Sequence, residues 1–131
     1  MLLDLNEDNA KAAVAELGEN SDYCLTNVIE EDNVKAAMEK TVEKFGAIHI
    51  LVNCAGIGTP SKTVSRGEPH DPSLFEKIIA VNLVGSFNCA ANAAVAMLRS
   101  GPCTKDGGRG VIVNTASLSL IHISAPTRPE R

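Results

Sequence analysis

The chain has 131 residues, enough for one domain at most, and its 44 % hydrophobic and 21 % charged residues are ordinary for a globular protein. The net charge of −4, without any cluster of lysine and arginine, argues against a nucleic-acid-binding surface. No apolar run is long enough to predict a transmembrane span, so we expect neither a nucleic acid nor a membrane as a partner.

The first two predicted elements are a short strand and a helix. Residues 1–5 are mostly apolar, contain the acid Asp4, and predict the strand. Residues 6–18 predict the helix, which a glycine ends. Asn6 and Asp8 are both able to cap its first turn, and the sequence alone leaves that choice open.

A second strand, a second helix and a third strand follow. Residues 21–28 and 48–53 predict the two strands. Residues 30–46 predict the helix, because hydrophobic side chains recur in it at helical spacing and Gly46 ends it. These hydrophobic residues are Val34, Met38, Val42 and Phe45.

The second half of the chain predicts a loop, a long helix, a turn and a last strand. Prolines and glycines indicate a loop over residues 58–72. Residues 73–99 are helical and apolar on several faces, which predicts burial on several sides. A surface turn over residues 100–110 then leads to a strand over residues 111–117.

Strands and helical segments therefore alternate in the order β-α-β-α-β-α-β. This order predicts an α/β fold with right-handed crossovers and a parallel sheet, in which ligands bind at the carboxyl ends of the strands. Polar or small residues lie at or just after the predicted strand ends, where packing of the hydrophobic core does not account for them. These are Asp4, Asn27, the segment from Asn53 to Gly56, and the segment from Asn114 to Ser117.

Asp4 is the first candidate binding residue. A carboxylate at a strand end can accept hydrogen bonds from both hydroxyls of an adenosine ribose. It also repels the extra phosphate of NADP, so it favours NAD. The alternative is structural, with Asp4 as a helix cap or a solvated turn acid.

Three further candidates follow along the chain. The segment from Asn53 to Gly56 leaves little side chain over the backbone, so a flat cofactor can lie against it; a plain β-turn is the alternative. Asn82 lies inside the long helix, where an amide is costly unless it is hydrogen-bonded, so a satisfied buried amide is the alternative. Ser117 ends the last strand and is either a substrate-binding hydroxyl or a turn serine.

Five motifs together carry a resemblance to a known family. The segments LLDL, TNV, ILVNCAGI, VNLVGSFN and GVIVNTAS resemble the short-chain dehydrogenase/reductase family in their order and spacing, from Met1 to about Ser117. The resemblance implies that residues 1–117 form a partial NAD-binding domain with a Rossmann-type, doubly wound parallel sheet. The long insertion after Gly58 and the turn before the last strand are most similar to a mitochondrial branch of the family that acts on 3-hydroxyacyl-CoA or hydroxysteroid substrates, and family members are usually tetramers.

The resemblance also implies a role for each candidate residue. Asp4 would hold the adenosine ribose, and Asn27 with Val28 would lie beside the adenine, although the family usually has Asp-Val there. Asn82 would hold the water of a proton relay, and Ser117 would orient the substrate carbonyl. The nicotinamide half of NAD would lie against Asn53, Cys54, Ala55 and Gly56.

Two family motifs are absent from these 131 residues. There is no Gly-x-x-x-Gly-x-Gly turn to bind a pyrophosphate, and the only tyrosine, Tyr23, is followed four residues later by Asn27 rather than by lysine. The family sheet order, 3-2-1-4-5, also places an absent strand between the strand that ends at Asp4 and the strand over residues 48–52. We therefore expect a fragment of an NAD-dependent oxidoreductase acting on secondary alcohols or ketones, inactive by itself.

Other interpretations remain open. The chain is alternatively a catalytically inactive subunit or interaction module that assembles with full-length partners through its long helix, or else a stand-alone nucleotide-binding module. No metal site is expected, because the four cysteines are widely spaced and form no Cys-x-x-Cys pair. We expect residues 118–131 to be an irregular tail that departs from the family and resembles translated sequencing-adapter text. No targeting segment is recognised, so a mitochondrial location rests on the resemblance, with the cytoplasm as the alternative.

Overall fold

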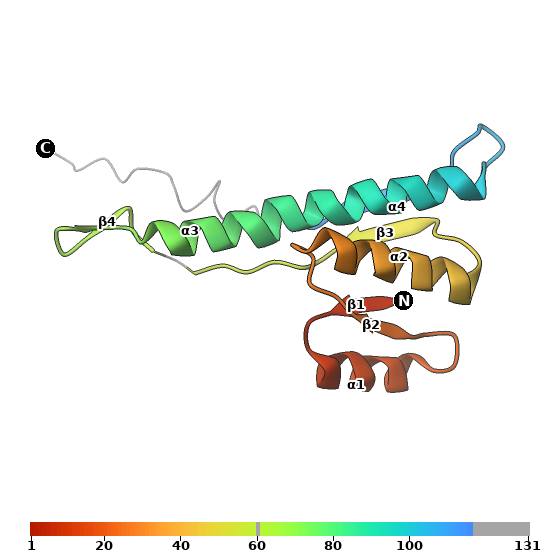
Figure 1. The fold of residues 1–131 in the computed structure, drawn as a ribbon, viewed down its shortest axis with the longest axis horizontal. Helices are drawn as coiled ribbons and strands as arrows, with labels where there is room; N and C mark the ends of the chain where they lie inside the picture. The colour runs from red at the N-terminus through yellow and green to blue at the C-terminus, as the bar shows by residue number, and fades with distance from the viewer. Residues whose placement is uncertain (60, 117–131) are drawn as a thin grey trace, which may run out of the picture.

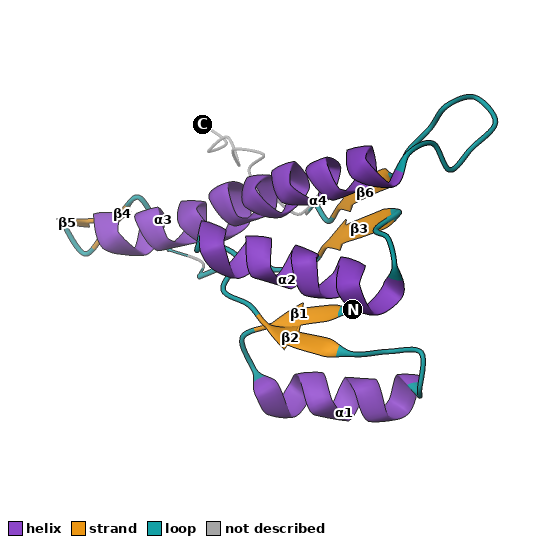
Figure 2. Ribbon diagram, turned by 45° about the vertical axis from the view of Figure 1, so that its right-hand side comes forward, coloured by secondary structure: helices purple, strands orange, loops and turns teal. Residues whose placement is uncertain are grey.

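The computed structural model describes residues 1–59 and 61–116, and it has the alternating α/β order that the sequence predicts (Figures 1 and 2). A helix covers the stretch between most consecutive strands. In chain order the elements are β1 (Leu2–Asp4), α1 (Glu7–Leu17), β2 (Tyr23–Leu25), α2 (Glu31–Phe45), β3 (Ile50–Asn53), β4 (Val64–Ser65), β5 (Glu68–Pro69), α3 (Pro72–Ile79), the π-helical segment η1 (Ala80–Gly85), α4 (Ser86–Ser100) and β6 (Val111–Asn114).

The parallel strands form two separate pairs. β1 lies beside β2, with Leu3 opposite Cys24, and β3 lies beside β6, with Leu51 opposite Ile112. Among the described strands nothing joins β1 to β3, although Figure 2 shows them running in the same direction. The two pairs thus remain separate among the described strands, and a further strand between β1 and β3 stays a prediction.

Local sequence signals set the ends of the first two helices. The Asn6 side chain accepts a hydrogen bond from the N–H of Asn9 at 3.0 Å, so Asn6 rather than Asp8 caps α1. Gly18 and Gly46 follow α1 and α2 with φ angles of 81° and 84°, a backbone conformation that glycine adopts at little cost.

The hydrophobic core lies where α2 and α4 cover one face of β3. Val34 and Ala93 are fully buried there, and Met38, Ile48 and Met97 are nearly so. α1 packs instead on β1 and β2, at the far end of the molecule in Figure 1. β1 is therefore held in place by α1, and β3 by α4.

The long helix runs without a break from α3 through η1 to α4, and it buries only one of its faces. Its large hydrophobic residues Phe75, Leu83, Phe87 and Leu98 are exposed. The predicted burial on several sides is thus wrong for the chain alone, because α2 and β3, the main elements that pack on α4, cover one side of it.

The same helix bears on the prediction that no apolar run is long enough to span a membrane. Pro72–Ser100 is a 29-residue helix with a window of mean hydropathy 1.6, which is long and apolar enough to cross a bilayer. The sequence-based statement that no run reaches this length is therefore wrong. Core helices of water-soluble proteins pass the same test, and the buried face of α4 packs on α2 and β3, so length and composition alone carry little weight.

A short hairpin occupies part of the region that the sequence predicts as a loop. β4 and β5 are antiparallel, and the two residues between them, Arg66 and Gly67, have φ angles of 55° and 85°. Two-residue hairpin turns favour positive φ at both central positions. Arginine seldom adopts such a backbone conformation, which explains why the sequence pattern did not indicate a hairpin.

Gly85 marks the closest approach between the long helix and the segment before α2. A Cβ at Gly85 would lie 2.5 Å from Cγ2 of Val28, whose branched side chain has little freedom to move. Gly85→Ala is expected to lower the free energy of unfolding by about 1–2 kcal/mol, despite the better helix propensity of alanine. Urea denaturation measures this, and Val28→Ala in the same chain should recover part of the loss. Equal midpoints for the Gly85 variant and the parent would contradict the prediction.

Candidate functional site

The candidate site is a cavity of about 620 Å³ that both parallel pairs border. Its wall includes the carboxyl end of β1, the carboxyl end of β3 and the segment that follows β3. Several residues that the sequence singles out lie together on this wall: Asp4, Val28, Asn53, Cys54 and Ala55. Asn27 and Gly56 do not line the cavity.

Asp4 is exposed and uses one of its two carboxylate oxygens in the structure. Oδ1 accepts a hydrogen bond from the N–H of Asn6 at 2.8 Å, which ties β1 to the start of α1. Oδ2 accepts no hydrogen bond from any described residue, so it remains available to a ligand hydroxyl. The structural and the ligand-binding interpretations of Asp4 are therefore compatible.

Asn27 is occupied by its own loop, whereas Val28 joins that loop to α4. The Asn27 side chain donates to Oε1 of Glu30 at 2.8 Å. The carbonyl of Val28 accepts from Nδ2 of Asn88 at 3.1 Å. Asn88 is a positioning residue that the sequence analysis missed, and the signal was an amide on the packed side of an apolar helix.

Asn53 links three elements. It is only 8 % exposed, and its Nδ2 donates to the carbonyl of Ser86 at 3.2 Å and to Oδ1 of Asn114 at 2.9 Å. The hydroxyl of Thr115 donates back to the carbonyl of Asn53 at 2.6 Å. Both amide protons are used inside the protein, so Asn53 acts through the position it gives to the following residues.

Cys54, Ala55 and Gly56 follow Asn53 as an exposed segment of small residues. A Cβ at Gly56 would lie 3.5 Å from Oδ1 of Asn82, an ordinary contact, so packing alone does not require glycine there. Main-chain groups are thus accessible along this segment. A flat cofactor can lie against them only if they are accessible, as the sequence analysis predicts.

Asn82 holds the far end of the same segment. Its Oδ1 accepts from the N–H of Ile57 and its Nδ2 donates to the carbonyl of Ile57, both at 2.8 Å. The side chain is exposed, so the alternative of a buried amide is wrong, although both its oxygen and its nitrogen are hydrogen-bonded to Ile57. Asn82 lies in η1, and π-helical segments are frequent at functional sites. A relay water held by Asn82 remains a prediction.

Asn82→Ala is expected to release the segment after β3 from the long helix. Amide hydrogen exchange at Ile57 should become about 10-fold faster, because its N–H loses its only acceptor in the described structure. The matched control is Asn92→Ala, which removes a bond to the Asn88 carbonyl within α4. Unchanged exchange at Ile57 in the Asn82 variant, measured by NMR, would contradict the assignment.

The residues present match part of an NAD molecule. Asp4 suits a ribose, and the small residues after Asn53 suit a flat ring. No lysine or arginine lines the cavity, so no side-chain cation there faces a pyrophosphate. The fit therefore extends to the adenosine ribose and the nicotinamide half.

Cys89 and Tyr23 are not placed for catalysis. Burial raises the pKa of the Cys89 thiol, which keeps it neutral on the cavity wall. Burial and a hydrogen bond to Glu7 raise the pKa of Tyr23, whose hydroxyl is bound at 3.2 Å on the α1 side of β2. Within residues 1–59 and 61–116, no group of three or more potential metal ligands comes together. Ser117 lies outside the described residues, as does the predicted tail.

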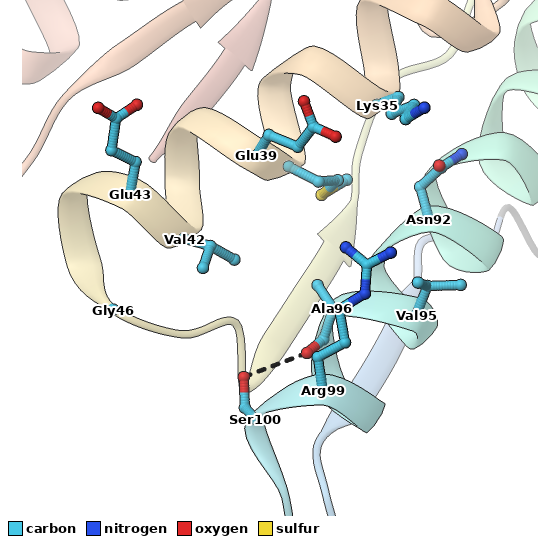
Figure 3. A pocket seen from close by; sticks show the side chains of 11 residues that line it. Lys35, Glu39, Val42, Glu43, Gly46, Asn92, Val95, Ala96, Arg99 and Ser100 are labelled. Carbon is cyan, nitrogen blue, oxygen red and sulfur yellow. Dashed lines mark hydrogen bonds between the residues drawn. The ribbon is translucent and has the colours of Figure 1, made fainter.

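A second cavity, of about 480 Å³, lies between α2 and α4 (Figure 3). Glu39 and Glu43 border it on α2, and Arg99 borders it on α4. It contains none of the residues that the sequence singles out as catalytic or cofactor-binding.

Comparison with known proteins decides the family. The family model described as short chain dehydrogenase matches residues 1–123. The chain belongs to the short-chain dehydrogenase family. This confirms the resemblance and the Rossmann-type α/β fold.

Named members of the short-chain dehydrogenase family are similar to most of this chain. It is 37 % identical over 121 residues to 3-hydroxyacyl-CoA dehydrogenase type-2 of Bos taurus and of Homo sapiens, with 91 % of this chain and 46 % of each relative aligned. The solved structure of 3-hydroxyacyl-CoA dehydrogenase type-2 from Mycobacterium avium is 34 % identical and superposes with a TM-score of 0.81, over 91 % of this chain and 47 % of that one. The chain thus spans about half the length of these relatives.

Proposed function

We propose that this chain supplies the NAD-recognition residues of an oxidoreductase that acts on a secondary alcohol or ketone, with a 3-hydroxyacyl-CoA or a hydroxysteroid as substrate. The observation that carries the proposal is the grouping of Asp4, Val28 and the segment from Asn53 to Ala55 on one cavity at the carboxyl ends of parallel strands. NAD accepts or donates the hydride in such a reaction.

Each residue has a defined task in this proposal. Asp4 binds the ribose hydroxyls through its free oxygen and selects NAD over NADP. The main chain of residues 54–56 lies against the nicotinamide half, and Asn82 holds that segment in place through Ile57. Val28 borders the adenine, and Ser117 orients the substrate carbonyl.

The 131 residues alone are expected to be inactive. Their only tyrosine, Tyr23, is engaged with Glu7, and no Tyr-x-x-x-Lys motif is present in these residues. A serine that orients a carbonyl does not supply the general acid and base step. The isolated chain mixed with NAD and a 3-hydroxyacyl-CoA should therefore form no NADH, and NADH formation would overturn this part of the proposal.

A chimera tests the proposal directly. Residues 1–116 replace the aligned segment of human 3-hydroxyacyl-CoA dehydrogenase type-2, whose remaining residues stay as they are. The expected result is reduction of NAD with a 3-hydroxyacyl-CoA or a hydroxysteroid, followed by absorbance. A folded chimera that binds no NAD in calorimetry would exclude cofactor recognition by these residues.

Asp4→Asn in that chimera is expected to reduce the preference for NAD over NADP by about 10-fold. The substitution keeps the shape of the side chain but removes the charge that opposes a 2′-phosphate, and a factor of ten corresponds to about 1.4 kcal/mol. The ratio of kcat/KM for the two cofactors measures this change. Asp8→Asn, on the exposed first turn of α1, is the matched control and should leave the ratio unchanged.

The exposed side of the long helix supports a second proposal, assembly. Phe75, Leu83, Phe87 and Leu98 leave an apolar surface open to solvent, and a homo-tetramer or a full-length partner would cover it. Co-purification with a mitochondrial full-length relative would favour an interaction subunit, whereas a soluble monomer at micromolar concentration would count against it. A mitochondrial location belongs to the same proposal, with the cytoplasm as the alternative.

A further inference from the structure

Val28 is held by two residues of the long helix, Gly85 and Asn88. A Cβ at Gly85 would lie 2.5 Å from Cγ2 of Val28, so the Val28 side chain packs directly on the helix backbone. Nδ2 of Asn88 donates to the carbonyl of Val28 at 3.1 Å. Val28 borders the cavity of the candidate site, whereas neither of the two helix residues does. Gly85 and Asn88 therefore reach that cavity only through Val28.

Hydrogen bonds fix the peptide planes on both sides of Val28. In the plane before it, the carbonyl of Asn27 accepts from the N–H of Glu30 at 3.1 Å. In the plane after it, Asn88 binds the Val28 carbonyl, and the N–H of Ile29 donates to Oδ1 of Asn27 at 3.4 Å. Two such planes determine the backbone dihedral angles of the residue between them. Of these three hydrogen bonds, only that from Asn88 comes from a distant part of the chain, 60 residues away.

The same loop leaves one main-chain donor free beside the cavity. The N–H groups of Asn27 and Ile29 donate to side-chain oxygens of Asn33 and Asn27, each at 3.4 Å. The N–H of Val28, between them, donates to no described residue. Val28 thus offers a ligand an apolar side chain and one unused donor, and the direction of both depends on the two peptide planes.

The long helix also holds the other half of the candidate site. Asn82 binds both main-chain groups of Ile57 at 2.8 Å and so positions the segment after β3. Asn82 and Asn88 belong to one continuous helix, Pro72–Ser100. The loop before α2 and the segment after β3 are therefore joined through a single stiff element.

We propose that Asn88 and Gly85 are positioning residues for the adenine half of NAD and act on it through Val28. This inference rests on the proposed function, in which Val28 borders the adenine and residues 54–56 lie against the nicotinamide half. Asn82 then sets the nicotinamide half alone. One helix fixes both halves relative to each other, yet a substitution in it should weaken one half and spare the other.

A purely structural role of Asn88 predicts a different result. If Asn88 only stabilised the folded state, its loss would lower the population of folded chain and weaken both halves equally. A positioning role acts on Val28 alone, because the one hydrogen bond described for the Asn88 side chain ends there. Ligands that represent one half each therefore separate the two roles.

The hydrogen bond itself is tested without any ligand, in the 131-residue chain. The carbonyl-carbon NMR resonance of Val28 should move upfield in Asn88→Ala, because that carbonyl loses its donor. Asn92→Ala, which removes a bond to the carbonyl of Asn88 within α4, is the matched control and should leave the Val28 resonance in place. An unchanged Val28 resonance in Asn88→Ala would overturn the proposal.

Two nucleosides then probe the two halves in the same chain by NMR titration. Adenosine represents the adenine half and nicotinamide riboside the nicotinamide half. Asn88→Ala should weaken adenosine binding about fivefold and change nicotinamide riboside binding by less than about twofold. Asn82→Ala should do the reverse. Gly85→Ala displaces Val28 without removing the hydrogen bond, so it should act like Asn88→Ala and replaces it if that variant does not fold.

Three further outcomes would overturn the proposal. Equal weakening of both nucleosides by Asn88→Ala would leave that residue a structural role only. Undiminished adenosine binding in both Asn88→Ala and Gly85→Ala would mean that the position of Val28 does not affect the adenine. In both cases the parent chain still binds both nucleosides, so the proposed function stands. A parent chain that binds no adenosine would instead refute the adenine assignment of the proposed function, and this inference with it.

Discussion

Gly110→Ala should lower the free energy of unfolding by about 3 kcal/mol, the largest single effect that we expect from a methyl group in this chain. A Cβ at Gly110 would lie 2.6 Å from the carbonyl oxygen of His49 and 2.6 Å from Sδ of Met97. That carbonyl accepts the first hydrogen bond of the β3–β6 pair, from Val111 at 2.9 Å. Moving it to relieve the clash would open the ladder.

The sulfur of Met97 offers little relief. Met97 is 5 % exposed and belongs to the core between α2, α4 and β3, so its displacement disturbs close packing. The matched control is Gly58→Ala, because nothing lies within 4 Å of a Cβ there. Urea denaturation of both variants measures the difference in midpoint. Equal midpoints for the two variants would contradict the prediction, because they would mean that the His49 carbonyl and Met97 move away from the added methyl group at no cost in stability.

Asn53→Ala is expected to cost about 2–3 kcal/mol of the free energy of unfolding. The substitution leaves the carbonyl of Ser86 and Oδ1 of Asn114 without the donor that now serves both. Asn20→Ala, at an exposed turn residue for which no side-chain hydrogen bond is described, is the control and should change stability by less than about 0.5 kcal/mol. A loss at Asn53 no larger than at Asn20 would contradict its linking role.

A second substitution at Asn53 separates hydrogen bonding from shape. Asn53→Asp places a carboxyl group against two acceptor oxygens in a buried position, so its folded pKa should lie above its unfolded pKa. Its stability relative to Asn53→Ala should then be greatest below the unfolded pKa, about 3.9, and should fall as the pH rises through the folded pKa. Parallel stability curves for the two variants from pH 3 to pH 7 would contradict this.

The site owes its geometry to amides that do not face a ligand. Asn53, Asn82 and Asn88 each connect an end of the β3 or β2 region to the long helix through main-chain groups. The sequence marked Asn53 because it follows a strand end, and Asn82 because an amide inside an apolar helix is costly unless it is hydrogen-bonded. It assigned Asn53 to the cofactor, whereas the structure places both of its amide protons within the protein.

The sequence by itself determined the alternation of the parallel strands with helices, the glycines that end α1 and α2, and the resemblance to the family. These features depend on local chemistry: glycines that accept positive φ, and apolar residues that recur with a fixed period. The parallel pairing follows from the alternation of strands and helices, because a helix between two strands brings the second back in the same direction. The position of Asp4 and of Asn53 at the carboxyl ends of β1 and β3, on one side of the molecule, was predictable for the same reason.

Only the tertiary structure decided which groups meet. The pairing of Asn82 with Ile57 depends on where η1 lies over the segment after β3, 25 residues away along the chain. The hairpin around Arg66 needs a backbone conformation that its residue type disfavours, and the exposed apolar face of the long helix depends on how many elements pack around it. Such features arise from contacts between distant segments and from burial, and neither quantity is encoded in any local stretch of sequence.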